Sequence, residues 1–160
     1  MTVLINILVV AGTAILPWLI DYCLSPKRRT GKRGWWLLLL AAAAFPLSQA
    51  LPNIHISHET STFQQHFVGG GIYCALVYSY LKLRFKWRCH WLIDLAVLFG
   101  FVSALGVANE LIEFTLVKVV HIKSIDISDT SWDLTANTTG GFVGYGLLRL
   151  GFWLSRSKEL

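Results

Sequence analysis

The chain has 160 residues, of which 54% are hydrophobic and only 14% charged, and its formal net charge is +5. This composition, with a mean hydropathy of +0.55, is typical of an integral membrane protein and argues against a soluble cofactor-dependent enzyme. Basic loops on the cytoplasmic side of a membrane would account for the positive charge, so we do not expect nucleic acid as a partner.

Apolar stretches follow one another along the whole chain and cover about residues 2–20, 35–51, 63–81, 91–117 and 133–153. Each approaches the roughly 20 residues that a helix needs to cross a bilayer. Backbone groups in lipid must bond within their own segment, so each stretch is expected to be a helix. The sequence therefore predicts an all-α fold: a polytopic membrane bundle of about five transmembrane helices that forms a single domain over residues 1–160.

The basic residues indicate how this bundle is oriented. Of the 14 lysines and arginines, only Lys118 and Lys123 fall in the second and fourth loops. The others fill the first loop, the third loop and the C-terminal end: Lys27, Arg28, Arg29, Lys32, Arg33, Lys82, Arg84, Lys86, Arg88, Arg149, Arg156 and Lys158. By the positive-inside rule, the N-terminus is expected outside the cell and the C-terminus in the cytoplasm.

Polar residues gather at the expected outer ends of the last three stretches, where they alternate with glycines at helical spacing. Asp133 and Asn137 are followed by Gly140, Gly141 and Gly144 on one face, and His66 is followed by Gly70 and Tyr73. Glu110 and Glu113 come after Gly106 in the same manner. Glycines allow helices to approach closely in lipid. We therefore expect Gly70, Gly140, Gly141 and Gly144 to pack helices together around a shared polar hollow that faces outward.

Each polar residue receives an expected role in this hollow. His66, Glu110 and Asp133 are candidate catalytic or ligand-binding residues, and Glu113, Asp129, Asn137 and Tyr73 are candidates for contact with a substrate. A divalent metal is a candidate cofactor, because histidine and carboxylate side chains can complete one ligand shell. Its candidate ligands are His66, Glu110, Glu113 and Asp133.

The order of three motifs resembles a known pattern. The segments HFVGGG, NELIEF and DTSWDLTANTTGG, within about residues 60 to 150, are similar to those of the YjdF-like bacterial inner-membrane proteins and, more loosely, of the VanZ-like family associated with teicoplanin resistance. His66, Glu110, Asp133, Asn137 and Gly141 match in turn. Gln64 and Gln65 stand where VanZ-like proteins often have an aspartate and a lysine. The resemblance implies a bacterial cytoplasmic membrane protein of the cell envelope, with a link to antibiotic resistance, but no particular reaction.

Three hypotheses about function remain open. In the first, the chain is an enzyme that uses acid–base or metal chemistry on a lipid or lipid-linked head group at the outer leaflet. In the second, the acidic hollow binds or transports a proton, a cation or a cationic amphiphile. In the third, the polar residues only join helices and bind no ligand. Membrane lipids are the expected partners in all three.

Overall fold

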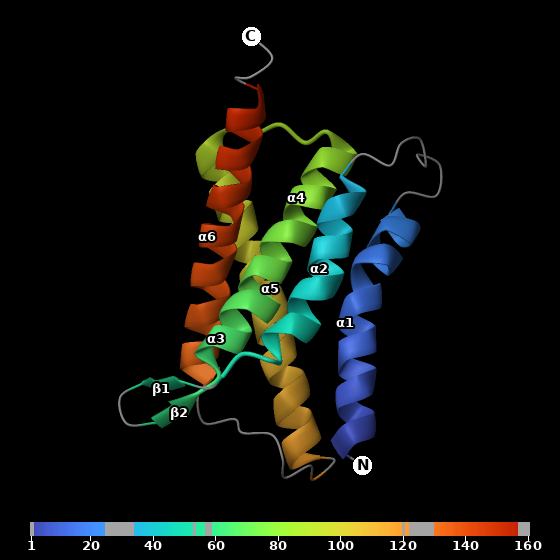
Figure 1. Cartoon of the computed structure of the whole chain (residues 1–160), viewed down its shortest axis with the longest axis vertical. Helices are drawn as coiled ribbons and strands as arrows, with labels where there is room; N and C mark the ends of the chain where they lie inside the picture. Colours follow the sequence, from blue (N-terminus) through green and yellow to red (C-terminus); the bar gives the residue numbers. More distant parts are fainter. Residues whose placement is uncertain are drawn as a thin grey trace.

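The structure, a computed structural model, describes residues 2–24, 34–52, 54–56, 59–119, 121 and 130–156. Its helices are α1 (Thr2–Leu24), α2 (Trp35–Ser48), α3 (Phe63–His66), the π-helical segment η1 (Phe67–Ile72), α4 (Tyr73–Phe85), α5 (Trp91–Lys118) and α6 (Thr130–Arg156). Because α3, η1 and α4 follow one another without a break, the described residues form five long helices (Figure 1). The prediction of a helical fold is thus confirmed.

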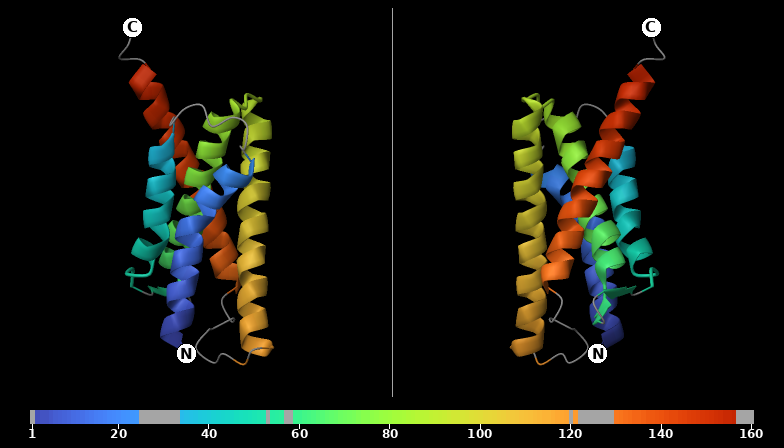
Figure 2. Two further views of the ribbon diagram at one scale, coloured as in Figure 1. Left: turned by 90° about the vertical axis from the view of Figure 1, so that its right-hand side faces the viewer. Right: turned by 90° about the vertical axis from the view of Figure 1, so that its left-hand side faces the viewer.

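The long helices run alternately up and down and pack side by side (Figures 1 and 2). One end of the bundle carries the beginning of α6, the last turns of α5 and a short β-hairpin, and we call it the hairpin end. The opposite end carries the connection from α4 to α5 and the last turns of α6. Consecutive helices are antiparallel neighbours, as short connections between helices require.

The β-hairpin was not predicted from the sequence. Strands β1 (Ile54–Ile56) and β2 (Glu59–Ser61) pair antiparallel, with Ile54 opposite Ser61 and Ile56 opposite Glu59. β-Branched residues such as isoleucine and threonine favour this extended backbone. The two strands lead from α2 into α3, so the hairpin sits directly before the helix that carries His66 (Figure 1).

Glycines bring η1 and α6 into contact at the level of the backbone. A Cβ atom added to Gly71 would lie 2.6 Å from the Cα of Gly140 and 2.5 Å from the carbonyl oxygen of Asn137, and one added to Gly140 would collide with the carbonyl oxygen of Phe67. Helices in lipid associate through such close packing because no hydrophobic difference drives them together. The tight contact fixes α6 against the helix that carries His66.

The other glycines expected to pack helices also lie at contacts between elements. A Cβ atom on Gly141 would come within 2.8 Å of Val102 on α5, and one on Gly144 within 3.1 Å of Ala75 on α4. A Cβ atom on Gly70 would collide with the side chain of Asn137. α6 therefore touches η1, α4 and α5 through residues that have no side chain.

Large apolar side chains cover much of the outer surface of the bundle. Leu39, Leu111, Leu147 and Trp153 are each about 60% exposed or more. Within the described residues, α5 is the one helix that is both long and apolar enough to cross a membrane: its mean hydropathy is 2.1, and only 22% of that stretch is buried. A core helix of a soluble protein is usually mostly buried, which α5 is not.

Candidate functional site

Three helices bring His66, Glu110 and Asp133 together at the hairpin end. His66 is the last residue of α3, Glu110 lies on α5, and Asp133 lies in the first turn of α6. One potential ligand atom from each residue lies within 4.8 Å of the other two. The His66 Nε2 and the Asp133 Oδ2 are 3.4 Å apart. The structure therefore groups the three residues that the sequence analysis proposed as the centre of the site.

Local structure explains why Asp133 can be buried at this position. Its side chain is only 4% exposed, but it belongs to the first turn of α6, where the helix dipole favours a negative charge. The hydroxyl of Thr62 donates a hydrogen bond to Asp133 Oδ1 at 3.0 Å. Thr62 precedes α3 as its N-cap residue, so this bond joins α6 to the beginning of the helix that carries His66.

Two oxygen atoms in this region are buried without a hydrogen-bond partner among the described residues. They are Oε1 of Glu110 and Oδ1 of Asn137. Asn137 is 4% exposed and lies one helical turn after Asp133, between Gly70 of η1 and Gly106 of α5. A buried acceptor that lacks a partner is unfavourable by about 1–3 kcal/mol. Both oxygens thus have an unused capacity to accept a hydrogen bond or to coordinate a cation.

The remaining candidates lie outside this group of three. Glu113 is one turn further along α5, where its Oε1 accepts a hydrogen bond from Asn109 Nδ2 at 2.7 Å. Tyr73 donates its hydroxyl to the carbonyl oxygen of Thr13 at 2.9 Å and thus contacts α1. Asp129 falls outside the described residues. The structure therefore brings Asn137 beside the central group but directs Tyr73 to another helix.

The charges around His66 favour a cation. Two carboxylates face one imidazole, and among the described residues the hairpin end has a single basic side chain of lysine or arginine, Lys118 at the end of α5. An imidazole nitrogen and carboxylate oxygens are suitable ligands for divalent metals such as zinc or manganese. The same groups can also exchange protons with a substrate.

An apolar groove runs between α5 and α6, beginning one residue after Asp133. It has a volume of about 380 Å³ and is lined on α6 by Leu134, Asn137 and the three threonines Thr135, Thr138 and Thr139. Each threonine hydroxyl donates to the carbonyl oxygen four residues earlier at 2.8 Å. Because these hydroxyls already donate hydrogen bonds within α6, the three threonines present mainly their methyl groups to the groove.

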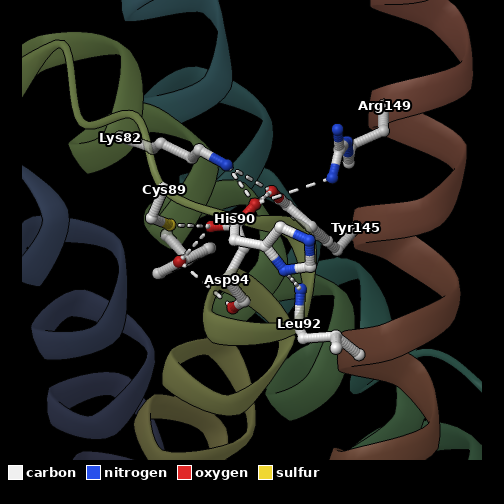
Figure 3. A network of polar contacts seen from close by, with 8 residues as sticks. Lys82, Cys89, His90, Leu92, Asp94, Tyr145 and Arg149 are labelled. Carbon is white, nitrogen blue, oxygen red and sulfur yellow. Dashed lines mark hydrogen bonds and ion pairs between the residues drawn. The ribbon is translucent and has the colours of Figure 1, made fainter.

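A second polar cluster, at the opposite end of the bundle, was missed by the sequence analysis. Asp94 of α5 is 1% exposed and accepts hydrogen bonds from Tyr78 and Lys82 of α4 and from Tyr145 of α6 (Figure 3). Arg149 of α6 lies close by. The sequence does contain an indication of this cluster: Asp94 is a lone carboxylate in the apolar segment WLIDLAVLF, and a charged residue within such a segment requires partners.

Comparisons with known proteins support a location in a membrane. Residues 63–152, more than half of the chain, match the family described as "Predicted membrane protein (DUF2238)". YjdF-like proteins are in this family, so the match supports that resemblance, while the VanZ-like one stays an expectation. No curated protein and no solved structure shows a significant match. The matched region contains His66, Glu110 and Asp133 as well as Asp94. The chain therefore belongs to the DUF2238 family of predicted membrane proteins.

Proposed function

We propose that the chain crosses a membrane with its five long helices. The exposed apolar surface supports this, because a bilayer would cover side chains that are unfavourable in water. α1 has 23 residues, α5 has 28 and α6 has 27. At a rise of about 1.5 Å per residue, each of these helices is longer than the ~30 Å thickness of the hydrocarbon layer. α2 has 14 residues, which cover about 21 Å, and local thinning of the bilayer would accommodate it.

We place the hairpin end outside the cytoplasm. Among the described residues, Lys82, Arg84, Lys86, Arg88 and Arg149 all belong to the last turns of α4, the connection to α5 or the second half of α6, at the opposite end. Positive charge near helix ends favours the cytoplasmic side. This orientation exposes the His66 site to the outer leaflet of a cytoplasmic membrane and is consistent with a role in the cell envelope.

At this site we propose that His66, Glu110 and Asp133 bind a divalent cation. The observation that carries the proposal is the convergence of their ligand atoms within 4.8 Å, from three different helices. Two buried carboxylates repel each other, and a doubly charged cation would neutralise both. Ligand atoms about 2.1 Å from a tetrahedral ion lie about 3.4 Å apart, which matches the 3.4 Å between His66 Nε2 and Asp133 Oδ2.

The unpartnered Oε1 of Glu110 supports the same conclusion. Glu110 occupies the third corner of the group, and its buried oxygen has no hydrogen-bond donor among the described residues. If the group served only to join helices by hydrogen bonds, this oxygen would be expected to have a donor. A metal ion would provide the missing partner.

The proposed role of the cation is to bind the polar head group of a lipid or lipid-linked ligand at the outer leaflet. A bound divalent ion polarises a phosphoryl oxygen and lowers the pKa of a bound water. The groove is lined on α6 by residues between Leu134 and Thr139, directly after Asp133 in the sequence, and on α5 by residues between Phe99 and Val107. An acyl chain placed there would leave its head group beside Asp133, so the groove favours a lipid over a free ion as the ligand.

The experiment is a titration of the purified, detergent-solubilised chain with Zn²⁺, Mn²⁺ and Mg²⁺ after treatment with EDTA. We expect binding of one ion per chain by calorimetry and elemental analysis, and at least about tenfold weaker binding in Glu110→Gln. Glu113→Gln is the matched control on the same helix, since Glu113 pairs with Asn109. Absence of binding by the parent chain, or equal affinity of the Glu110→Gln variant, would overturn the proposal in favour of a purely helix-joining role.

A further inference from the structure

The Asp94 cluster at the opposite end has two cations, Lys82 and Arg149, around a single carboxylate. Asp94 Oδ1 accepts a hydrogen bond from the Tyr78 hydroxyl at 2.6 Å, and its Oδ2 accepts bonds from Lys82 and Tyr145. One cation, Lys82, is thus in direct contact with the buried carboxylate, which also accepts hydrogen bonds from two tyrosine hydroxyls and from the Cys89 thiol at 3.7 Å. The charge of Asp94 is compensated without Arg149.

Arg149 is therefore a surplus cation. Its Nη1 atom is 3.7 Å from Asp94 Oδ2, beyond hydrogen-bond distance, and its side chain is 55% exposed. Its guanidinium lies 6.0 Å from the ring centroid of Tyr145, and Figure 3 shows it directed toward the cluster from α6. Among the described residues, Asp94 is the one acidic side chain that pairs with it. Most of its donors are thus available to an incoming anion.

Lys82 extends the same positive region. Its ammonium donates to Asp94 and to the Tyr145 hydroxyl, the latter at 2.8 Å, which leaves one of its three donors unused. The side chain is 22% exposed, so this donor is within reach of the surface. Lys82 and Arg149 stand on either side of Tyr145 in Figure 3, and together with Asp94 they carry a net charge of about +1 at neutral pH.

Tryptophans indicate the depth of this cluster in a bilayer. Trp36, Trp87, Trp91 and Trp153 lie at the same end and are between 44% and 66% exposed. Trp91 begins α5 one turn before Asp94, and Trp153 follows Arg149 by one turn on α6. Exposed tryptophans concentrate at the level of lipid head groups. The surplus cation is thus at the depth where lipid phosphates are found.

We propose that Arg149 and Lys82 form a binding site for the phosphate of an anionic phospholipid in the leaflet at this end. A guanidinium recognises phosphate oxygens with two parallel hydrogen bonds, and the ammonium adds a point charge. The charge of the buried Asp94 carboxylate is offset by Lys82, which pairs with it directly, so the group keeps its net positive charge toward the anion. The site is independent of the proposed metal site, which lies at the hairpin end.

The test compares binding of short-chain phosphatidylglycerol and phosphatidylcholine to the purified chain in detergent, followed by native mass spectrometry. We expect the parent chain to prefer phosphatidylglycerol and Arg149→Gln to lose about tenfold or more in affinity for it. The Arg149→Lys variant keeps the positive charge but cannot donate two parallel hydrogen bonds to one phosphate. We expect it to bind phosphatidylglycerol with intermediate affinity. Lys86→Gln removes an exposed cation at the same end and is the control, with the unfolding temperature measured for every variant.

Three outcomes would overturn the proposal. Equal binding of both lipids by the parent chain would remove the preference for an anion. An equal loss of affinity in Lys86→Gln and Arg149→Gln would indicate attraction to the whole basic surface and not to a site. Inorganic phosphate or glycerol phosphate that displaces the lipid at matched concentration would identify the ligand as a soluble phosphate.

Discussion

Asp94 and Glu110 lie on one helix, α5, about 24 Å apart along its axis, and each is a meeting point for the same set of helices. Asp94 contacts α4 through Lys82 and α6 through Tyr145. Glu110 meets His66, in the same continuous helix as α4, and Asp133 of α6. These helices are therefore joined by polar clusters at both ends, with glycine contacts between them.

We predict that Lys82→Met lowers the free energy of unfolding by about 1–3 kcal/mol, because a buried carboxylate would lose its cation. Asp94 is 1% exposed, so water cannot readily replace the ammonium. The measurement is the thermal unfolding temperature in detergent. Lys86→Met, an exposed position at the end of α4, is the control. If both variants unfold at the same temperature, the pair with Asp94 contributes nothing to stability.

A second prediction compares two glycines of α6. A Cβ atom on Gly140 would collide with the carbonyl oxygen of Phe67, whereas one on Gly146 meets nothing within 4 Å. Gly140→Ala should therefore destabilise the bundle by about 1–3 kcal/mol through overpacking. Gly146→Ala should be neutral or stabilising by up to about 1 kcal/mol, because alanine favours a helix. Equal unfolding temperatures for the two variants would contradict the backbone contact between η1 and α6.

The long helices and the centre of the site could be predicted because both leave a regular pattern of residue types in the sequence. Each helix coincides with an apolar run, and the polar residues of the site alternate with glycines on one helical face. His66, Glu110 and Asp133 thus pointed to a common hollow although they are distant in sequence. The hairpin at 54–61 could not be found in this way, since strands of three residues are too short for a periodic pattern.

Two other features depend on geometry that helical spacing does not reveal. Gly70 and Tyr73 would share a face in an ordinary α-helix, but the π-helical segment η1 widens the turns between Phe67 and Ile72. Tyr73, which follows this segment directly, donates its hydroxyl to Thr13 of α1. The Asp94 cluster was missed because Lys82 and Arg149 were counted only as basic residues near a membrane surface. Their pairing with Asp94 becomes visible when the three helices are placed together.

The last prediction concerns orientation, which can be tested with cysteines. Cys23 is exposed near the end of α1, at the opposite end of the bundle from the hairpin, and we expect it to face the cytoplasm. Gln49 is exposed just after α2, at the hairpin end. In intact bacterial cells, a membrane-impermeant maleimide should label Gln49→Cys but not Cys23, because the reagent cannot cross the bilayer.

Permeabilised cells provide the control, in which Cys23 should also react. Cys74 is buried and should stay unlabelled in both preparations, whereas the half-buried Cys89 lies at the same end as Cys23 and is replaced by serine in all variants. A reporter fused to the C-terminus should be active only in the cytoplasm, since α6 ends on the same side as Cys23. Labelling of Cys23 in intact cells, or a C-terminal reporter active only outside, would reverse the orientation. The His66 site would then face the cytoplasm and could not act on lipids of the outer leaflet.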